Sequence, residues 1–178
     1  MPNAILKLLP EINKIKDKNI KQKTMATWEE GTKIGGWKFE DLEKIPFTLL
    51  TIQIPANLIE HTRAVTKTAI EIAKIVSQFY KEIKINYDYL ISGAILHDVG
   101  KLLEYKKTKD KITKSPSGKL LRHPISGAAL AHKNALPEEI VHIIAVHSHE
   151  GDGGFRSPEA IIVHHSDFIN FEVLGGKA

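Results

Sequence analysis

The feature that most restricts the fold is a helical spacing of apolar residues that begins after Pro55. Steps of three and four residues connect the members of one stripe: His61, Val65, Ala69, Ile72, Ala73 and Val76. Side chains at this spacing share one face of an α-helix, and Asn57 is a suitable residue to cap its start. The pattern predicts a helix over about residues 57–81 that buries one face.

Helical patterns dominate the rest of the chain as well. Similar spacing predicts helices over about 4–22, 87–104, 137–148 and 158–171, and another that begins near Lys119 or Pro124. Residues 24–56 are expected to form loops and short helical pieces, and 106–119 a polar, lysine-rich loop. No alternating strand pattern and no internal repeat is found. The expected fold class is therefore all-α, with one bundle-like domain in 178 residues.

Composition excludes several kinds of protein. The chain has no cysteine, which excludes disulfides and thiolate metal sites. No apolar run is long enough to cross a membrane, and no signal-peptide pattern opens the chain, so we expect a soluble, cytoplasmic protein. The net charge of +4 comes almost entirely from lysine. Because nucleic-acid readers usually rely on arginine, this excess favours solvated surface and leaves nucleic acid only as an alternative partner.

Histidines and carboxylates end or open several of the apolar helical segments. The stretch "LISGAILHDVGKLLEY" (90–105) carries two of them in the middle of a run that could otherwise fill a core. The set comprises His61, His97, Asp98, His123, His147, His149 and Asp167. A single buried histidine is more often bonded to a carbonyl, because an unpaired buried polar group is costly. For a whole set in one small domain, convergence on a metal is the simpler explanation.

The types of ligand restrict the metal but do not select it. Imidazole and carboxylate without sulfur suit iron, manganese, zinc, cobalt or nickel. Adjacent helical residues point about 100° apart, so His97 and Asp98 can face one ion only if the end of their helix points at it. Alternatively, Asp98 bridges two ions with its two oxygens. The residues alone leave both arrangements open.

The ordered set of His61, His97-Asp98 and Asp167 resembles the H…HD…D motif of the HD-domain phosphohydrolase superfamily. The segments "HDVGK", "HPISGAAL" and "HSHEGDGG" are similar to the branch that contains HD-GYP phosphodiesterases and exoribonuclease-type HD domains. The resemblance covers about residues 55–171. It implies an all-α HD domain over 55–178, with residues 1–54 as a helical and loop extension packed on it.

The resemblance also implies roles for individual residues. His61, His97, Asp98 and Asp167 would hold a first divalent ion, and His123 and His147 a second, with Asp98 bridging. Asp98 and Lys101 would be catalytic, with Lys101 meeting the phosphate, and His149 and Arg156 are further candidates for substrate contact. The chain departs from the HD-GYP pattern in two places: His147-Ser148-His149 replaces two adjacent histidines, and Gly154-Phe155-Arg156 replaces the GYP tripeptide. Hydrolysis of cyclic di-GMP is therefore not implied.

The expected function is hydrolysis of a phosphomonoester or phosphodiester, with a nucleotide or cyclic nucleotide as the small phosphorylated substrate. Two divalent ions, with magnesium also possible, would activate a water molecule and leave the site positive enough for a phosphate. The main alternative is a sensor domain that binds metal or nucleotide without turnover. Oxygenase chemistry at a di-iron site and a purely helical interaction domain are lesser alternatives.

Overall fold

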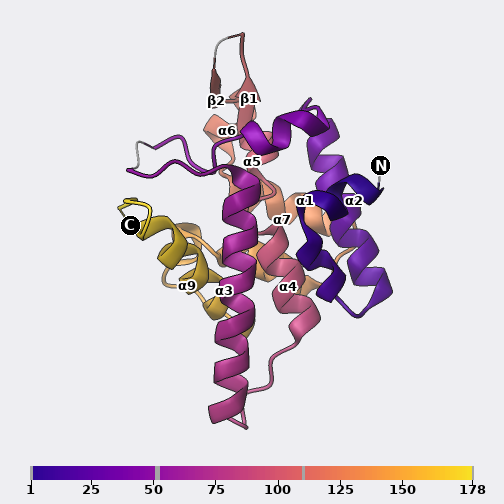
Figure 1. Cartoon of the computed structure of the whole chain (residues 1–178), viewed down its shortest axis with the longest axis vertical. Coiled ribbons are helices and arrows are strands. Elements are labelled where there is room, and N and C mark those ends of the chain that lie inside the picture. Colours follow the sequence, from indigo (N-terminus) through magenta and orange to yellow (C-terminus); the bar gives the residue numbers. More distant parts are fainter. Residues whose placement is uncertain (1, 51–52, 110, 178) are drawn as a thin grey trace.

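The fold is built around one long helix. The computed structural model describes residues 2–50, 53–109 and 111–177. Helix α3 (Leu58–Phe79) packs against α4 (Tyr87–Leu96) on one side and α9 (Pro158–Glu172) on the other (Figure 1). Helices α7 (His123–Lys133) and α8 (Glu138–Val146) pack on each other, and α8 also packs on α4. This arrangement confirms the all-α fold class.

Helix α3 begins where its sequence predicts. The side chain of Asn57 accepts a hydrogen bond from the backbone N–H of Glu60, and the carboxylate of Glu60 accepts one from the N–H of Asn57. This reciprocal capping box satisfies two backbone donors that a helix start leaves free. It fixes the first turn of α3, which carries His61.

The N-terminal segment differs from the expected helix over 4–22 and from the loops and short helical pieces expected over 24–56. Its elements are α1 (Pro2–Leu8), the 3₁₀ helix η1 (Pro10–Lys14), α2 (Lys18–Ile34) and the 3₁₀ helix η2 (Phe39–Lys44). Pro10 lacks the N–H that a continuous helix needs, and the carboxylate of Asp17 caps a new helix by accepting from two backbone N–H groups. Helix α2 continues past residue 24 because tertiary packing outweighs the weak helix preference of its glycine.

Helix α2 packs on α4, on α7 and on the short helix α5 (Lys101–Glu104), so the N-terminal segment shares one apolar core with the rest of the chain. Gly31 of α2 packs closely on α7: a Cβ there would lie 3.0 Å from the side chain of Leu130. The indole of Trp28 is fully buried in this core. The core therefore extends across the boundary near residue 54 that the sequence suggests.

The expected single helix over 87–104 is broken. Helix α4 ends at Leu96, four residues form turns, and the short helix α5 (Lys101–Glu104) follows. The break leaves carbonyls without helical partners. The carbonyl of Ala94 accepts from His97 Nδ1 (2.7 Å), and that of Ile95 accepts from the Trp28 indole N–H (3.1 Å). These side chains replace the missing helical hydrogen bonds and hold the turn.

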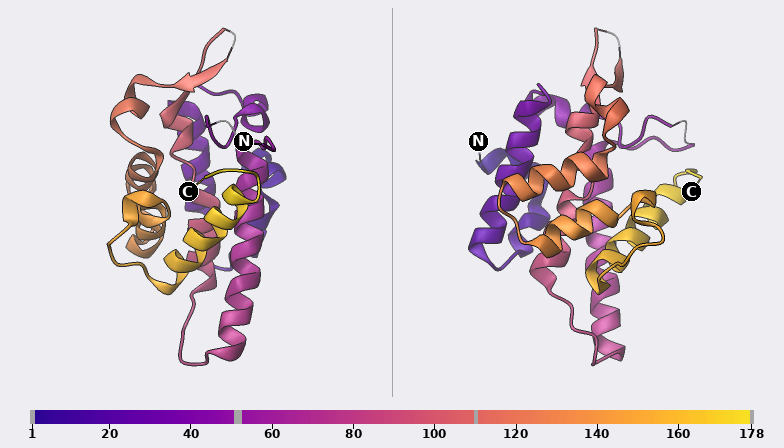
Figure 2. Two further views of the ribbon diagram at one scale, coloured as in Figure 1. Left: turned by 90° about the vertical axis from the view of Figure 1, so that its left-hand side faces the viewer. Right: turned by 180° about the vertical axis from the view of Figure 1, so that it is seen from behind.

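A small hairpin follows, which the sequence did not predict. Strand β1 (Tyr105–Lys107) pairs antiparallel with β2 (Ile112–Lys114), and these are the only strands in the described part of the chain. Three residues per strand are too few to give a recognisable alternation. The hairpin projects from the helical body, and helix α6 (Pro116–Leu120) leads back to it (Figure 2). None of the described helices has the length and apolarity that a membrane span requires.

Gly100 gives a direct test of how tightly the break is packed. A Cβ at this position would collide with the backbone of His123 and of Gly127, and backbone cannot rotate away. We therefore expect Gly100→Ala to lower the free energy of unfolding by about 2 kcal/mol or more. Gly154→Ala is the matched control, because its Cβ would lie 3.4 Å from the nearest atom, an ordinary contact. Urea denaturation of both variants measures the difference, and equal stabilities would contradict it.

Candidate metal centre

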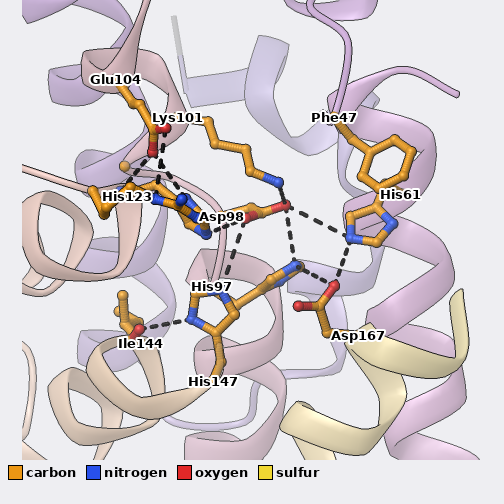
Figure 3. A network of polar contacts seen from close by, with 12 residues as sticks. Phe47, His61, His97, Asp98, Lys101, Glu104, His123, Ile144, His147 and Asp167 are labelled. Carbon is orange, nitrogen blue, oxygen red and sulfur yellow. Dashed lines mark hydrogen bonds and ion pairs between the residues drawn. The ribbon is translucent and has the colours of Figure 1, made fainter. Parts of the chain in front are cut away.

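Six predicted ligand residues meet in the interior from five separate parts of the fold (Figure 3). His61 lies in the first turn of α3, His97 and Asp98 in the turn after α4, His123 at the start of α7, His147 directly after α8, and Asp167 in α9. The four histidines and Asp98 are buried, and the side chain of Asp167 is 16% exposed. The structure thus brings together every residue that the sequence suggested as a metal ligand.

Asp98 lies at the centre, and each of its oxygens faces a different pair of imidazoles. Asp98 Oδ2 is 3.7 Å from His61 Nε2 and 3.4 Å from His97 Nε2. Asp98 Oδ1 is 3.3 Å from His123 Nε2 and 3.8 Å from His147 Nε2. The two trios share only Asp98, and within each the facing atoms lie within 4.8 Å of one another. A carboxylate that bridges two cations needs this arrangement.

Several of these buried atoms have no hydrogen-bond partner among the described residues. They are His97 Nε2, His147 Nε2 and Asp98 Oδ1. His97 and His147 each direct Nδ1 at a backbone carbonyl, of Ala94 and Ile144 respectively, both at 2.7 Å. Nδ1 must donate there, so a neutral ring presents the lone pair of Nε2 to the carboxylate. Lone pairs that face one another in a buried space fit a cation between them.

His123 is oriented by a carboxylate rather than by a carbonyl. Glu104 Oε2 accepts from His123 Nδ1 at 2.9 Å and from the backbone N–H of His123 at 2.7 Å. Burial opposes ionisation of Glu104, but the His123 hydrogen bond prevails and lowers its pKa to about 2. A carboxylate behind a ligating imidazole fixes the ring and raises its basicity. Glu104 therefore supports His123 from behind and is not a surface residue.

His61 is held differently from the other three histidines. Its Nε2 lies 2.8 Å from Asp167 Oδ1, while Nδ1 has no partner within the described residues. The ring of Phe47 stacks on the imidazole at a centroid distance of 4.2 Å. Asp167 Oδ1 is also 3.9 Å from His97 Nε2, so Asp167 adjoins the first trio. Stacking on Phe47 thus sets the ring orientation together with Asp167, without a hydrogen bond at Nδ1.

Lys101 supplies the positive charge closest to Asp98. Its Nζ lies 2.6 Å from Asp98 Oδ2, and the side chain is buried beside the ring of Phe47. Burial lowers the pKa of Lys101, but the Asp98 charge outweighs it and the pKa is raised. Lys101 therefore stays protonated, one helical turn beyond Asp98, on the side of the Oδ2 trio.

The charge states suit a cation site. Burial alone raises the pKa of Asp98, but Lys101 and then His97 hold it well below the usual range, so Asp98 is ionised. Burial, with His97 and His123 adding to it, lowers the pKa of His147 to about 3 and keeps that ring neutral. Burial also lowers the pKa of His61. Burial opposes the charged form of His97 too, but the neighbouring Asp98 charge outweighs it and raises the pKa of His97. Neutral His61 and His147 beside ionised Asp98 are in the protonation states that metal ligands need, whereas His97 would release its proton when a cation binds.

A pocket of about 300 Å³ opens over this centre. His123, Lys101 and Asp167 form part of its wall. The wall also includes cationic and aromatic side chains, namely Lys114, Arg122, Lys177, Phe47, Tyr105, Phe168 and Phe171, beside Glu104 and the aliphatic Leu49 and Leu50. Such a wall suits a ligand that carries both an anionic group and a flat ring.

The other predicted substrate contacts occupy two different places. His149 lines the pocket and is largely exposed, with Nδ1 2.8 Å from Asp152. Arg156 is not among the residues that line the pocket. Its guanidinium donates to the carbonyls of Val146 and Ser148 and to Asp152, so in this structure it braces the glycine-rich loop, which includes the 3₁₀ helix η3 (His149–Gly151).

Phe47, Lys114 and Arg122 border the site without having been anticipated. No local pattern distinguishes them, because they reach the pocket through the path of loops. Arg122 had one available signal: it immediately precedes His123 in "RHPISG". His164 directs Nδ1 at the carbonyl of His147 at 2.6 Å, so it supports the ligand segment from behind.

The helical bundle buries two sets of histidines around one shared aspartate. This arrangement is typical of helical proteins that bind a pair of metal ions. The profile of the HD domain family matches residues 58–169, which is more than half of the chain. The chain therefore belongs to the HD domain family. This agrees with the ordered histidines and aspartates, and proteins of this family bind divalent metals.

Two kinds of curated relative are similar to the chain. The dihydroneopterin 2',3'-cyclic phosphate phosphodiesterase of Methanocaldococcus jannaschii is 37% identical over 114 residues, which cover 62% of this chain and 45% of that protein. Ribonuclease Y of Lawsonia intracellularis is 30% identical over 110 residues, which cover 62% of this chain and 19% of that protein. The chain thus spans less than half of these relatives. No solved structure gives a significant match.

Glu104 allows a test of the support behind His123. Glu104→Gln removes the charge that raises the basicity of the imidazole, so we expect affinity for Mn²⁺ to fall by about 10-fold or more. Calorimetric titration of the purified protein measures this affinity. Glu43→Gln on η2, an exposed glutamate, is the control. Unchanged affinity in Glu104→Gln would show that His123 does not depend on this carboxylate.

Proposed function

We propose that the protein is a metal-dependent phosphohydrolase that cleaves a phosphodiester of a nucleotide or cyclic nucleotide. The observation that carries this proposal is the division of Asp98 between two pairs of imidazoles, with unpartnered Nε2 atoms on His97 and His147. Membership of the HD domain family supports it. A relative with 37% identity is named as a cyclic phosphate phosphodiesterase, which favours a phosphodiester over a monoester.

We assign two divalent ions to the site. His61, His97, Asp98 and Asp167 would hold one ion, and Asp98, His123 and His147 the other. Nitrogen and oxygen donors without sulfur suit manganese, iron, cobalt, nickel or zinc more than they suit magnesium, which prefers oxygen alone. When bound, such ions supply positive charge to phosphate oxygens and bring the pKa of water toward neutrality.

The chain's own groups would position and stabilise the substrate. Lys101 Nζ, held at Asp98 on the wall of the pocket, is placed to donate to a phosphoryl oxygen as negative charge develops there. Arg122 is half exposed at the pocket wall and can pair with a second oxygen. His149 offers an imidazole at the open side of the pocket. Each would act on the substrate through charge or hydrogen bonding.

The walls of the pocket support a nucleotide-derived substrate. Aromatic rings of Phe168 and Phe171 share the pocket with Lys114 and Lys177. Rings can stack on a base, and the ammonium groups can pair with phosphate. A volume of about 300 Å³ is at the lower end of the range for small-molecule sites. The pocket therefore suits one nucleotide unit.

Metal-dependent hydrolysis provides the test. With Mn²⁺ or Fe²⁺ we expect the protein to hydrolyse 2',3'-cyclic nucleotides and bis-p-nitrophenyl phosphate, and chelation to abolish turnover until metal is restored. Asp98→Asn removes a charge that both sites share, so turnover should fall at least about 100-fold. Spectrophotometric and chromatographic assays of product measure both effects.

The control is Glu71→Gln, which removes one negative charge from an exposed position on α3. It should retain full activity. Metal and nucleotide binding without any product would contradict hydrolysis and favour a sensor domain. Full activity in Asp98→Asn would contradict the assignment of the site.

A further inference from the structure

The net positive charge of the chain is concentrated in one segment. Residues 106–122 contain seven basic residues and one acidic residue. The whole chain has 25 basic and 21 acidic residues, so the remainder has 18 and 20. Outside this segment the protein is therefore slightly acidic. All of the net positive charge lies on the hairpin, on α6 and on the turn into α7.

Two lysines of this segment are free to meet a ligand. Lys106 on β1 and Lys119 on α6 are exposed, and neither pairs with a carboxylate among the described residues. By contrast, Lys107 pairs with Asp41 at 2.6 Å, and Lys114 lies 3.5 Å from Glu104. The charge of Lys106 and Lys119 is thus not compensated by neighbours that the structure describes.

These lysines line a groove that adjoins the metal centre. The groove runs between the hairpin and α6 and is lined by Lys106, Thr113, Lys114, Pro116, Lys119 and Leu120. Lys114 also lines the pocket over the candidate metal centre, together with Arg122 and Lys101. Because the pocket and the groove share Lys114, they form one cationic path from Lys101 to the hairpin. The hairpin projects from the body (Figure 2).

We propose that this path binds the phosphate backbone of a single-stranded polynucleotide and leads one of its phosphodiesters to the metal centre. The inference rests on the proposed function and extends its substrate from a free nucleotide to a strand. Lysine is a compact point charge without the fork that reads bases, so the contact would be independent of sequence. Backbone-tracking cationic grooves are the usual means of binding single strands.

An anionic membrane would be attracted by the same charge, but it is the less favoured partner. Binding to a membrane surface would not explain why the groove shares Lys114 with the pocket over the metal centre. Binding to a strand explains it, because the strand has one phosphate per nucleotide and could contact both the pocket and the groove. The relative from Lawsonia intracellularis is named as a ribonuclease, which is consistent with a strand as ligand.

The test compares binding and turnover in the full chain. Anisotropy of a 5'-fluorescein-labelled 12-nucleotide oligouridylate measures binding as a function of salt. Lys106→Gln with Lys119→Gln should weaken binding about tenfold or more at low salt, and reduce the slope of log K against log salt by roughly 1.4, that is about 0.7 per lost phosphate contact. Hydrolysis of 2',3'-cyclic AMP should not change, since neither lysine lines the metal-centre pocket.

Lys81→Gln with Lys84→Gln is the control. It removes the same charge from the loop between α3 and α4, at the opposite end of the molecule from the hairpin (Figure 1), and should leave RNA binding within about twofold of wild type. Equal losses in both double variants, or no RNA binding by wild type, would overturn the proposal. The proposal would also be overturned if the variant with Lys106→Gln and Lys119→Gln still binds RNA but no longer binds phosphatidylserine vesicles. If the wild-type protein binds RNA but does not hydrolyse 2',3'-cyclic AMP, the result would instead count against the proposed function.

Discussion

The buried carboxylate of Asp98 is the constraint on which the rest of the structure depends. An ionised carboxylate away from water is costly unless its charge is compensated. In this fold Lys101 at 2.6 Å compensates the charge, and four imidazoles surround both oxygens. Lys101 satisfies one oxygen, while Oδ1 has no hydrogen-bond partner in the described part of the chain. That imbalance is why we assign cations to the site.

Much of the helical packing serves to bring these groups together. The break after Leu96 lets His97 and Asp98 leave the course of α4, and the Trp28 indole and the His97 ring satisfy carbonyls that the break exposes. The absence of a side chain at Gly100 lets the turn meet the backbone at the start of α7, which places His123 opposite Asp98. A change in the packing of α2 would therefore shift the turn that carries His97 and Asp98, although α2 supplies none of the candidate ligands.

The sequence allowed the helical class, the start of α3 and the group of histidines and aspartates that meets in the interior to be predicted, because these depend on local spacing, on the type of side chain or on the order of a family motif. The break after α4 was not predicted, because a buried turn is stable only when tertiary partners such as Trp28 satisfy its backbone carbonyls. Phe47 was missed because stacking on His61 depends on the path of a loop. The clustering of lysine on the hairpin is visible in the sequence, but its junction with the pocket through Lys114 becomes visible only in three dimensions.

The most direct test of the account is the position of bound metal relative to Asp98. Crystals grown with Mn²⁺ and measured for anomalous scattering should show two peaks, one beside Oδ2 near His61 and His97, the other beside Oδ1 near His123 and His147. Their separation should be about 3.5–4 Å, as in other sites where two ions share a bridging ligand. A single peak, or peaks that do not contact Asp98, would contradict the claim that this carboxylate organises two metal sites.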